Sequence, residues 1–325
     1  MRAPVTTKVA GVAILLAASA LVLPPFAVTL LTEVCILGLF AMSLDLMVGY
    51  ARLVSFGHAA AYGLGAYSCA LMLLHTSIPL PFVIVLSALF SGVVAIGIGW
   101  VCTMATGISF AMLTLAFGQL FYAITIKWSS VTNGSDGLVG ILRTPGPFGW
   151  DGLVSRTGFY LFCAGCLIAA YLFCRALIRS PFGNVLLGIR DNEAKIRSLG
   201  FNTRRYKISV IAISYLLGGM AGALYAAFAK FASPDLVFWP VSGQVLIMVI
   251  LGGSGTLLGP ILGAAFYMLV EYQLGVYTDA WALVLGSIFI LSVIFMPRGI
   301  WGLFKRRAKA GEVALKVGVV NEDRN

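Results

Sequence analysis

Charge is scarce in this chain of 325 residues. Only 10% of its residues are charged and 60% are hydrophobic, whereas an ordinary soluble domain has about 25% charged residues. A soluble protein of this size would leave much of that apolar surface exposed and would precipitate. The same composition excludes a disordered chain, a collagen-like chain and a secreted disulfide scaffold. The sequence therefore predicts an all-α, polytopic helical membrane protein.

Motifs for nucleotide binding and catalysis are also missing. The chain has no G-x-x-x-x-G-K-[ST] phosphate-binding loop, no H-E-x-x-H metal motif, and only two histidines, His58 and His75. Enzymes need clusters of nucleophile and base or of metal ligands. We therefore expect neither catalysis nor a metal site. The six cysteines all lie in apolar runs, where a thiol usually behaves as a small hydrophobic group rather than as part of a disulfide framework.

Positive charge is concentrated in three short segments. Lys and Arg number 22 against 12 Asp and Glu, a net charge of +10, and 17 of the 22 lie within residues 2–8, 175–207 and 298–325. A nucleic-acid-binding protein would instead carry basic residues across a folded, water-facing surface. Basic clusters beside apolar runs follow the positive-inside rule. We therefore expect both termini and residues 178–207 to be cytoplasmic, with lipid and not nucleic acid as a partner.

Apolar runs place about ten spans along a single membrane domain, residues 1–325. At ~20 residues per span, they are 9–24, 30–48, 57–75, 82–102, 107–127, 157–177, 208–229, 242–257, 258–274 and 280–297. Residues 242–274 could form one long helix, but their glycines and Pro260 favour two short or re-entrant segments. The first run could be a cleavable signal peptide, although Pro24-Pro25 favours an uncleaved span. A basic cytoplasmic tail is expected at 298–325.

Small residues recur at every fourth position in three places. These are Gly57, Ala61 and Gly65, then Gly218, Gly222 and Ala226, then Gly255, Gly259 and Gly263. In lipid such stripes let helix backbones approach closely. Internal packing is the favoured interpretation, and a role in lining a path or a partner interface is the alternative.

The polar segment 178–207 predicts a cytoplasmic amphipathic helix or helix pair. Ser180-Pro181 is a helix start, Asp191-Asn192 can break the helix, and Gly200 suits a left-handed stop. One face is apolar and carries Phe182, Val185, Leu186 and Ile189. Such a helix either lies on the lipid surface or docks into the groove of a partner.

Seven motifs follow one another along nearly the whole chain. They are residues 43–50 with 55–59 and 63–67, then 114–119, 132–137, the segment from 180–183 to 205–207, 233–235, 251–256 with 259–260, and 296–299. Together, and in this order, they resemble the LivM-like permease subunits of ABC importers for branched-chain amino acids. Two departures from the usual pattern of that family are Asp45 in place of Asn and Arg52-Leu53 in place of Gly-Gln.

The resemblance implies a permease subunit of the bacterial inner membrane that is not an enzyme and has no cofactor of its own. The implied partners are a homologous second permease, two cytosolic subunits that bind ATP, and an external solute-binding protein. The implied coupling residues are Phe182, Ile189, Arg190, Asp191, Glu193, Ala194 and Gly200. Glu193-Ala194 and Gly200 match the coupling motif of the family with a spacing that differs by one residue, and Lys195 replaces its second Ala.

Candidate residues of the translocation path are polar or glycine residues near predicted helix ends. They are Asp45, Ser55, Gly57, His58, Gly252, Gly253, Gly255 and Glu271. Asp45 could line the path, pair with Arg52 or form an interfacial salt bridge, and His58 fits a core hydrogen bond better than a proton relay. Glu271 is the better candidate for a buried polar partner, and Glu33 for an interfacial group.

In the outer loop, Gly134 and Asp136 are candidates for docking a binding protein, although Asp136 could equally be a turn residue.

The nearest functional alternative is a sister permease for urea, short amides or aromatic carboxylates. A membrane-embedded enzyme and a self-sufficient secondary transporter are remoter alternatives.

Overall fold

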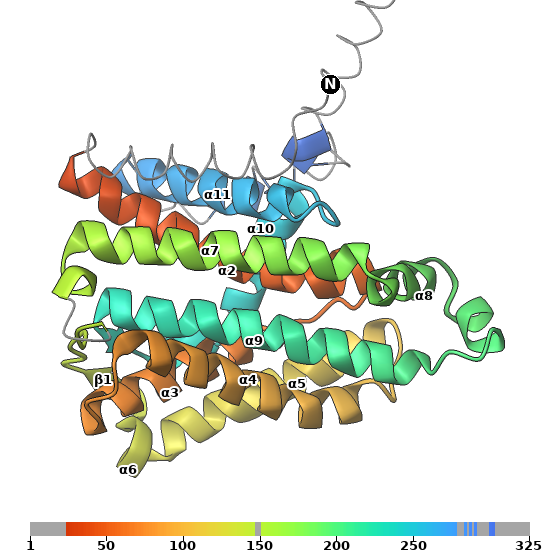
Figure 1. The fold of residues 1–325 in the computed structure, drawn as a ribbon, viewed down its shortest axis with the longest axis horizontal. Coiled ribbons are helices and arrows are strands. Elements are labelled where there is room, and N and C mark those ends of the chain that lie inside the picture. The colour runs from red at the N-terminus through yellow and green to blue at the C-terminus, as the bar shows by residue number, and fades with distance from the viewer. Residues whose placement is uncertain are drawn as a thin grey trace, which may run out of the picture.

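The computed structural model describes residues 24–146 and 151–277, together with 283–284, 286–287, 289–290 and 299–302. The spans expected at 9–24 and 280–297 and the basic tail at 298–325 lie wholly or mostly outside these residues. Within the described part, long helices run side by side in one bundle (Figure 1).

Nine of the described helices form the frame of the bundle. They are α2 (Pro25–Ala51), α3 (Ala59–His75), α4 (Leu80–Cys102), α5 (Ile108–Lys127), α7 (Arg156–Arg179), α8 (Pro181–Ser198), α9 (Thr203–Ala229), α10 (Trp239–Gly252) and α11 (Leu258–Tyr277). Proline in the first turn starts α2, α4, α8 and α10, because first-turn N–H groups need no helical partner. Helices α2, α4, α5, α7 and α9 are long and apolar enough to cross a membrane, and α3 and α10 are shorter apolar helices. The predicted fold class is confirmed.

Short elements close the end of the bundle that lies opposite α8 (Figure 1). They are α6 (Ser129–Thr132), η1 (Gly134–Asp136), β1 (Leu138–Val139), η3 (Asp151–Leu153), β2 (Phe231–Ala232) and η4 (Pro234–Val237). β1 and β2 pair antiparallel, with Leu138 opposite Ala232 and Val139 opposite Phe231. The chain therefore has a polar helical segment at one end and compact loops at the other.

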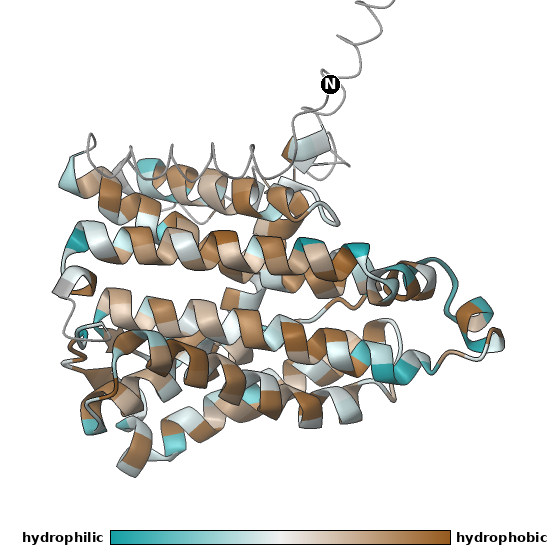
Figure 2. Ribbon diagram, viewed as in Figure 1, coloured by the Kyte–Doolittle hydropathy of each residue, from teal (hydrophilic) through white to brown (hydrophobic). Residues whose placement is uncertain are grey.

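The surface of the bundle is apolar along its length. Figure 2 shows hydrophobic residues along the helices and hydrophilic residues gathered around α8. On α4 alone, exposed large side chains are Phe82, Val85, Leu86, Leu89, Phe90, Val93, Ile96 and Trp100. Such a surface would cause a soluble protein to aggregate, but it suits contact with lipid or with another membrane subunit.

Two of the small-residue stripes meet where α3 crosses α9. A Cβ atom added to Gly65 would overlap the carbonyl of Gly219, and one added to Gly222 would overlap the carbonyl of Tyr62. Helix α9 packs against α2 and α4 as well as α3. The third stripe joins α10 to α11, since a Cβ on Gly263 would overlap the Met248 carbonyl. The packing interpretation of these stripes is confirmed.

The predicted break within residues 242–274 is present. Helix α10 ends at Gly252 and α11 begins at Leu258. Between them, Gly253, Gly255 and Leu257 have positive φ angles of 108°, 75° and 59°. Glycine adopts such angles without steric cost, so the glycines of this segment allow the chain to turn here. We call residues 253–257 the inner turn.

Candidate functional site

Helix α8 consists of two helical arms joined by a kink. Asn192, with φ −158° and ψ 96°, is not helical, so residues 181–191 form a first arm and residues 193–198 a second arm. The Asn192 side chain accepts a hydrogen bond from the backbone N–H of Lys195 (3.0 Å), as an N-cap does. Gly200 follows with φ +88°. The predicted helix pair and its left-handed glycine are confirmed.

The apolar face of the first arm packs against the helices of this chain. Leu186 and Ile189 are buried, and the Phe182 ring stacks on Tyr206 of α9 with 5.3 Å between centroids. These contacts hold the first arm onto the bundle. The structure therefore places Phe182 and Ile189 where they attach α8 to its own chain, rather than on a face left free for a partner.

Arg190 attaches the first arm to the end of α2. Its Nη1 donates a hydrogen bond to the carbonyl oxygen of Gly49 (3.0 Å), in the last turn of α2. A cation suits this position because the carbonyl end of a helix carries partial negative charge. The Nε of Arg190 lies 3.3 Å from Oδ1 of Asp191, which is itself largely exposed.

Asp45 holds the inner turn. Its side chain is fully buried, and its two carboxylate oxygens accept hydrogen bonds from the backbone N–H of Gly255 (2.6 Å) and of Leu257 (3.2 Å). Buried backbone N–H groups require such partners. Of the alternatives for Asp45, the pairing with Arg52 is not found, and Arg52 ends α2 in a left-handed conformation and is exposed.

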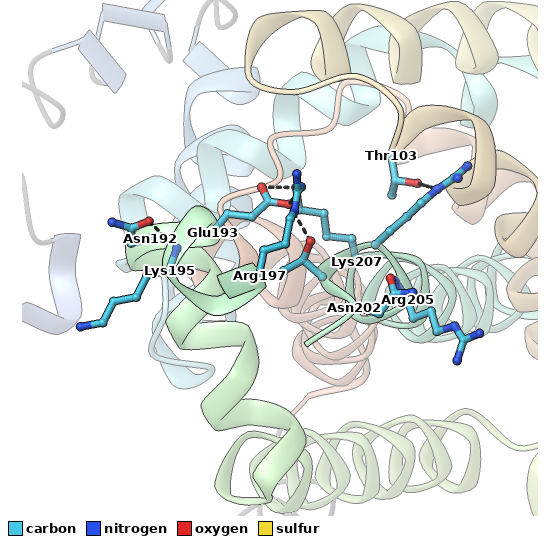
Figure 3. Close-up of polar contacts among 10 residues, drawn as sticks. Thr103, Asn192, Glu193, Lys195, Arg197, Asn202, Arg205 and Lys207 are labelled. Carbon is cyan, nitrogen blue, oxygen red and sulfur yellow. Dashed lines mark hydrogen bonds and ion pairs between the residues drawn. The ribbon is translucent and has the colours of Figure 1, made fainter. Parts of the chain in front are cut away.

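Glu193 attaches the second arm to the start of α9 (Figure 3). Its Oε2 accepts a hydrogen bond from Lys207 Nζ (2.6 Å), and its Oε1 accepts from Thr203 Oγ1 (3.0 Å) and Arg197 Nη2 (3.3 Å). Burial by itself raises the pKa of the Glu193 carboxyl, but hydrogen bonds from Lys207 and Thr203 outweigh burial and lower the pKa below its ordinary 4.5. Glu193 is therefore an ionised link inside the chain.

The first turn of α9 is also bound to the end of α4. Arg204 Nη2 donates to the carbonyl oxygen of Trp100 (2.7 Å), and its Nε donates to Thr103 Oγ1 (3.3 Å). The guanidinium also lies over the Trp100 ring, 5.3 Å from its centroid, in a cation–π contact. These contacts fix where α9 begins, next to the second arm.

The outward surface at this end includes residues that the sequence pattern did not single out. Leu199 and Phe201 flank Gly200 and are 63% and 41% exposed, and the predicted coupling residue Ala194 is exposed as well. An apolar residue on each side of a glycine that is predicted to end a helix is a sequence signal that could have identified this exposed surface. The roles of Thr203 and Lys207 had no such signal, because they depend on how α8 folds back on α9.

Three of the proposed path residues meet in the turn between α2 and α3. His58 Nε2 and Ser43 Oγ are hydrogen-bonded (2.8 Å), and the His58 ring stacks on Phe40. Ser55 Oγ accepts from the N–H of Gly57 (3.3 Å). A Cβ on Gly57 would overlap a backbone carbonyl of α5. All three residues are buried in the bundle interior, so His58 makes the expected core hydrogen bond.

The remaining candidates lie elsewhere in the fold. Glu271 is half-buried on α11. Gly134 and Asp136 form η1 at the end of the bundle opposite α8, and the exposed Asp136 carboxylate accepts a hydrogen bond from Ser135 (3.3 Å). Among the described residues, no three His, Cys, Asp or Glu side chains gather as a metal site would require.

Comparison with known proteins places most of the chain in one family. Residues 26–294 match the family model described as "Branched-chain amino acid transport system / permease component". The high-affinity branched-chain amino acid transport system permease protein LivM of Escherichia coli K12 is 26% identical over 299 residues, covering 86% of this chain and 70% of the relative. LivM of Salmonella typhimurium LT2 is 25% identical over 292 residues, covering 83% and 69%. A probable LivM of Methanocaldococcus jannaschii is 34% identical over 113 residues, covering 33% and 31%. No solved structure matches the chain.

Proposed function

Because this chain belongs to the branched-chain amino acid transport permease family, we propose that it forms one half of the membrane pathway of an ABC importer for branched-chain amino acids. It is a multi-pass inner-membrane protein and a permease subunit. The sister permeases for urea, amides or aromatic carboxylates are not favoured by its relatives, several of which carry branched-chain amino acid transport in their names.

The observation that carries this proposal is the polar two-armed helix α8 at one end of an apolar bundle (Figure 2). A permease needs a rigid element outside the membrane that a partner can move and that is anchored to the spans. Helix α8 is anchored through Arg190 to α2 and through Glu193 to α9. The exposed side chains that directly follow α8, Leu199 and Phe201, are the part that an ATP-binding subunit would contact.

The other partners of the proposed importer are the ones that the family resemblance implies. Because its sequence has no phosphate-binding loop, ATP would be bound and hydrolysed on two partner subunits on the cytosolic side. A homologous second permease would complete the path, and an external solute-binding protein would dock at the end of the bundle that carries η1. The turns at 52–58 and 253–257, where helices α2 and α10 end, are the parts of the path most suited to hold a zwitterionic amino acid.

Reconstitution tests the assignment directly. Liposomes containing this chain, the second permease and both ATP-binding subunits should take up labelled leucine only when ATP is inside and the binding protein is outside. Excess isoleucine or valine should compete, whereas urea, acetamide and benzoate should not. Leucine uptake or ATP hydrolysis by this chain alone would refute the assignment.

The proposed orientation has a separate test. A cysteine replacing exposed Asn192 should react with a membrane-impermeant maleimide only after the cytosolic side is opened, and one replacing exposed Ser135 should react from outside. The native cysteines are buried or half-buried, which keeps the background low. Labelling of position 192 from the outside of intact cells would overturn the orientation.

A further inference from the structure

Helix α9 connects the second arm of α8 to the interior of the bundle. Lys207 lies in its first turns and bonds Glu193. Two turns farther along, Ser214 Oγ donates to the carbonyl oxygen of Ser43 (2.5 Å), and Tyr215 Oη donates to that of Gly57 (3.1 Å). Seven residues are about two turns, so Lys207 and Ser214 lie on the same side of α9.

The ion pair between Glu193 and Lys207, which we call the joint, is more buried than an ordinary surface ion pair. The Lys207 side chain is only 7% exposed, and lysine is almost never buried unless it is paired. Its ammonium is 2.6 Å from the Glu193 carboxylate. Removing either partner would leave a poorly solvated charge, which is strongly destabilising. By contrast Arg197, which reaches the same carboxylate, is 71% exposed, and exposed pairs contribute little.

The first arm has a different anchor. Arg190 bonds Gly49 near the end of α2, and one turn earlier on α2 Asp45 holds the inner turn. The kink at Asn192 separates this anchor from the Glu193 joint. The first arm is therefore tied to the end of α2, whose Asp45 holds the inner turn, and the second arm is tied to α9.

We propose that Glu193 and Lys207 are positioning residues for coupling: they carry displacement of the second arm of α8 into α9, and through Tyr215 to the turn at 52–58. Glu193 acts through Lys207 inside this chain and not through a contact with the ATP-binding subunit. This inference rests on the proposed function, because it assumes that an ATP-binding subunit moves α8.

A charge exchange between the two residues tests the joint. In the assembled transporter, Glu193→Lys places two cations together and Lys207→Glu places two anions together. Each should lower leucine uptake per ATP hydrolysed by about tenfold, within the usual range of coupling energies. The double variant restores an ion pair of opposite polarity between the same two positions. We expect it to return to within about threefold of the unmodified protein.

Matched controls separate this joint from other roles of the segment. Arg197→Ala removes the exposed partner of the same carboxylate and should leave uptake per ATP unchanged. Glu193→Gln and Lys207→Met make smaller changes and serve if a charge-reversed single variant does not assemble. Their effects on uptake per ATP should not add in the double variant, because both break the same pair.

Two results would overturn the inference. If Glu193 contacts the ATP-binding subunit directly, Glu193→Lys will impair coupling, Lys207→Glu will not, and the double variant will stay impaired. If the variants assemble and all transport at the unmodified ratio, the joint has no part in coupling. An unmodified assembly that takes up no branched-chain amino acid would instead refute the proposed function. In that case the charge-exchange variants can be tested by the uptake of any solute that the unmodified assembly does transport.

Discussion

Replacing Gly222 by alanine should weaken the crossing of α3 and α9. A Cβ at this position would overlap the carbonyl oxygen and carbonyl carbon of Tyr62. Both atoms belong to the backbone of α3, so no side-chain rotation can relieve the overlap, and the two helices must separate. In lipid, helix association depends on close packing rather than on the hydrophobic effect, so this separation removes part of what holds the bundle together.

The expected magnitude is the difference between two effects. Overpacking costs about 1–3 kcal/mol, and we expect the upper end because the obstacle is backbone. Alanine is favoured over glycine within a helix by about 1 kcal/mol. The net loss in the free energy of unfolding is therefore about 2 kcal/mol, which for a chain of 325 residues lowers the melting temperature by about 3 °C.

The native cysteines provide the assay, and Gly97 provides the control. A maleimide that fluoresces on reaction with thiols will report unfolding of the detergent-purified chain, since five of its six cysteines are buried and the sixth is half-buried. Gly97 is also within a helix, but a Cβ there meets no atom within 4 Å. Gly97→Ala should therefore melt at or above the temperature of the unmodified protein. The packing argument fails if Gly222→Ala melts as high as Gly97→Ala.

Three further predictions concern the end of the bundle that carries α8. Asp45→Ala should lower the melting temperature more than Asp45→Asn. Alanine leaves two backbone N–H groups of the inner turn unpaired, at about 1–3 kcal/mol each, whereas the amide oxygen of asparagine still accepts one of these hydrogen bonds. Equal melting temperatures of the two variants would contradict this prediction. Glu193→Gln should melt below the unmodified protein at neutral pH. Because the folded-state pKa of Glu193 is below 4.5, melting curves across an acid series should keep this difference above pH 4.5 and lose it as the pH falls through the folded pKa. Gly200→Val should uncouple ATP hydrolysis from uptake, whereas Gly200→Asn should retain coupling. The φ angle of Gly200 is +88° and no atom crowds an added Cβ, so the strain of a substitution is in the backbone, and asparagine tolerates this conformation better than valine. Equal coupling in both variants would argue against a left-handed requirement.

Much of the candidate site was predictable because its signals are local. The kink at Asn192, the left-handed Gly200 and the inner turn each depend on residues that adjoin them in sequence. The interpretation of α8 as having a free apolar face was less successful, because its Ile189 is buried by the chain itself. Which face of an amphipathic helix meets its own protein depends on how the neighbouring helices are placed, and periodicity does not contain that information.

The sequence by itself determined that this is a helical membrane protein, where its described spans lie and where they break. Long apolar runs must be helical in lipid, since each backbone N–H and C=O then finds a partner within its own segment. Tertiary structure alone decided the long-range partners of Asp45 and Arg190. Asp45 bonds the backbone of Gly255, 210 positions away, and Arg190 bonds Gly49, 141 positions away. Such contacts depend on the relative placement of packed helices, which many distant residues fix together, so no local pattern of charge or hydrophobicity specifies them.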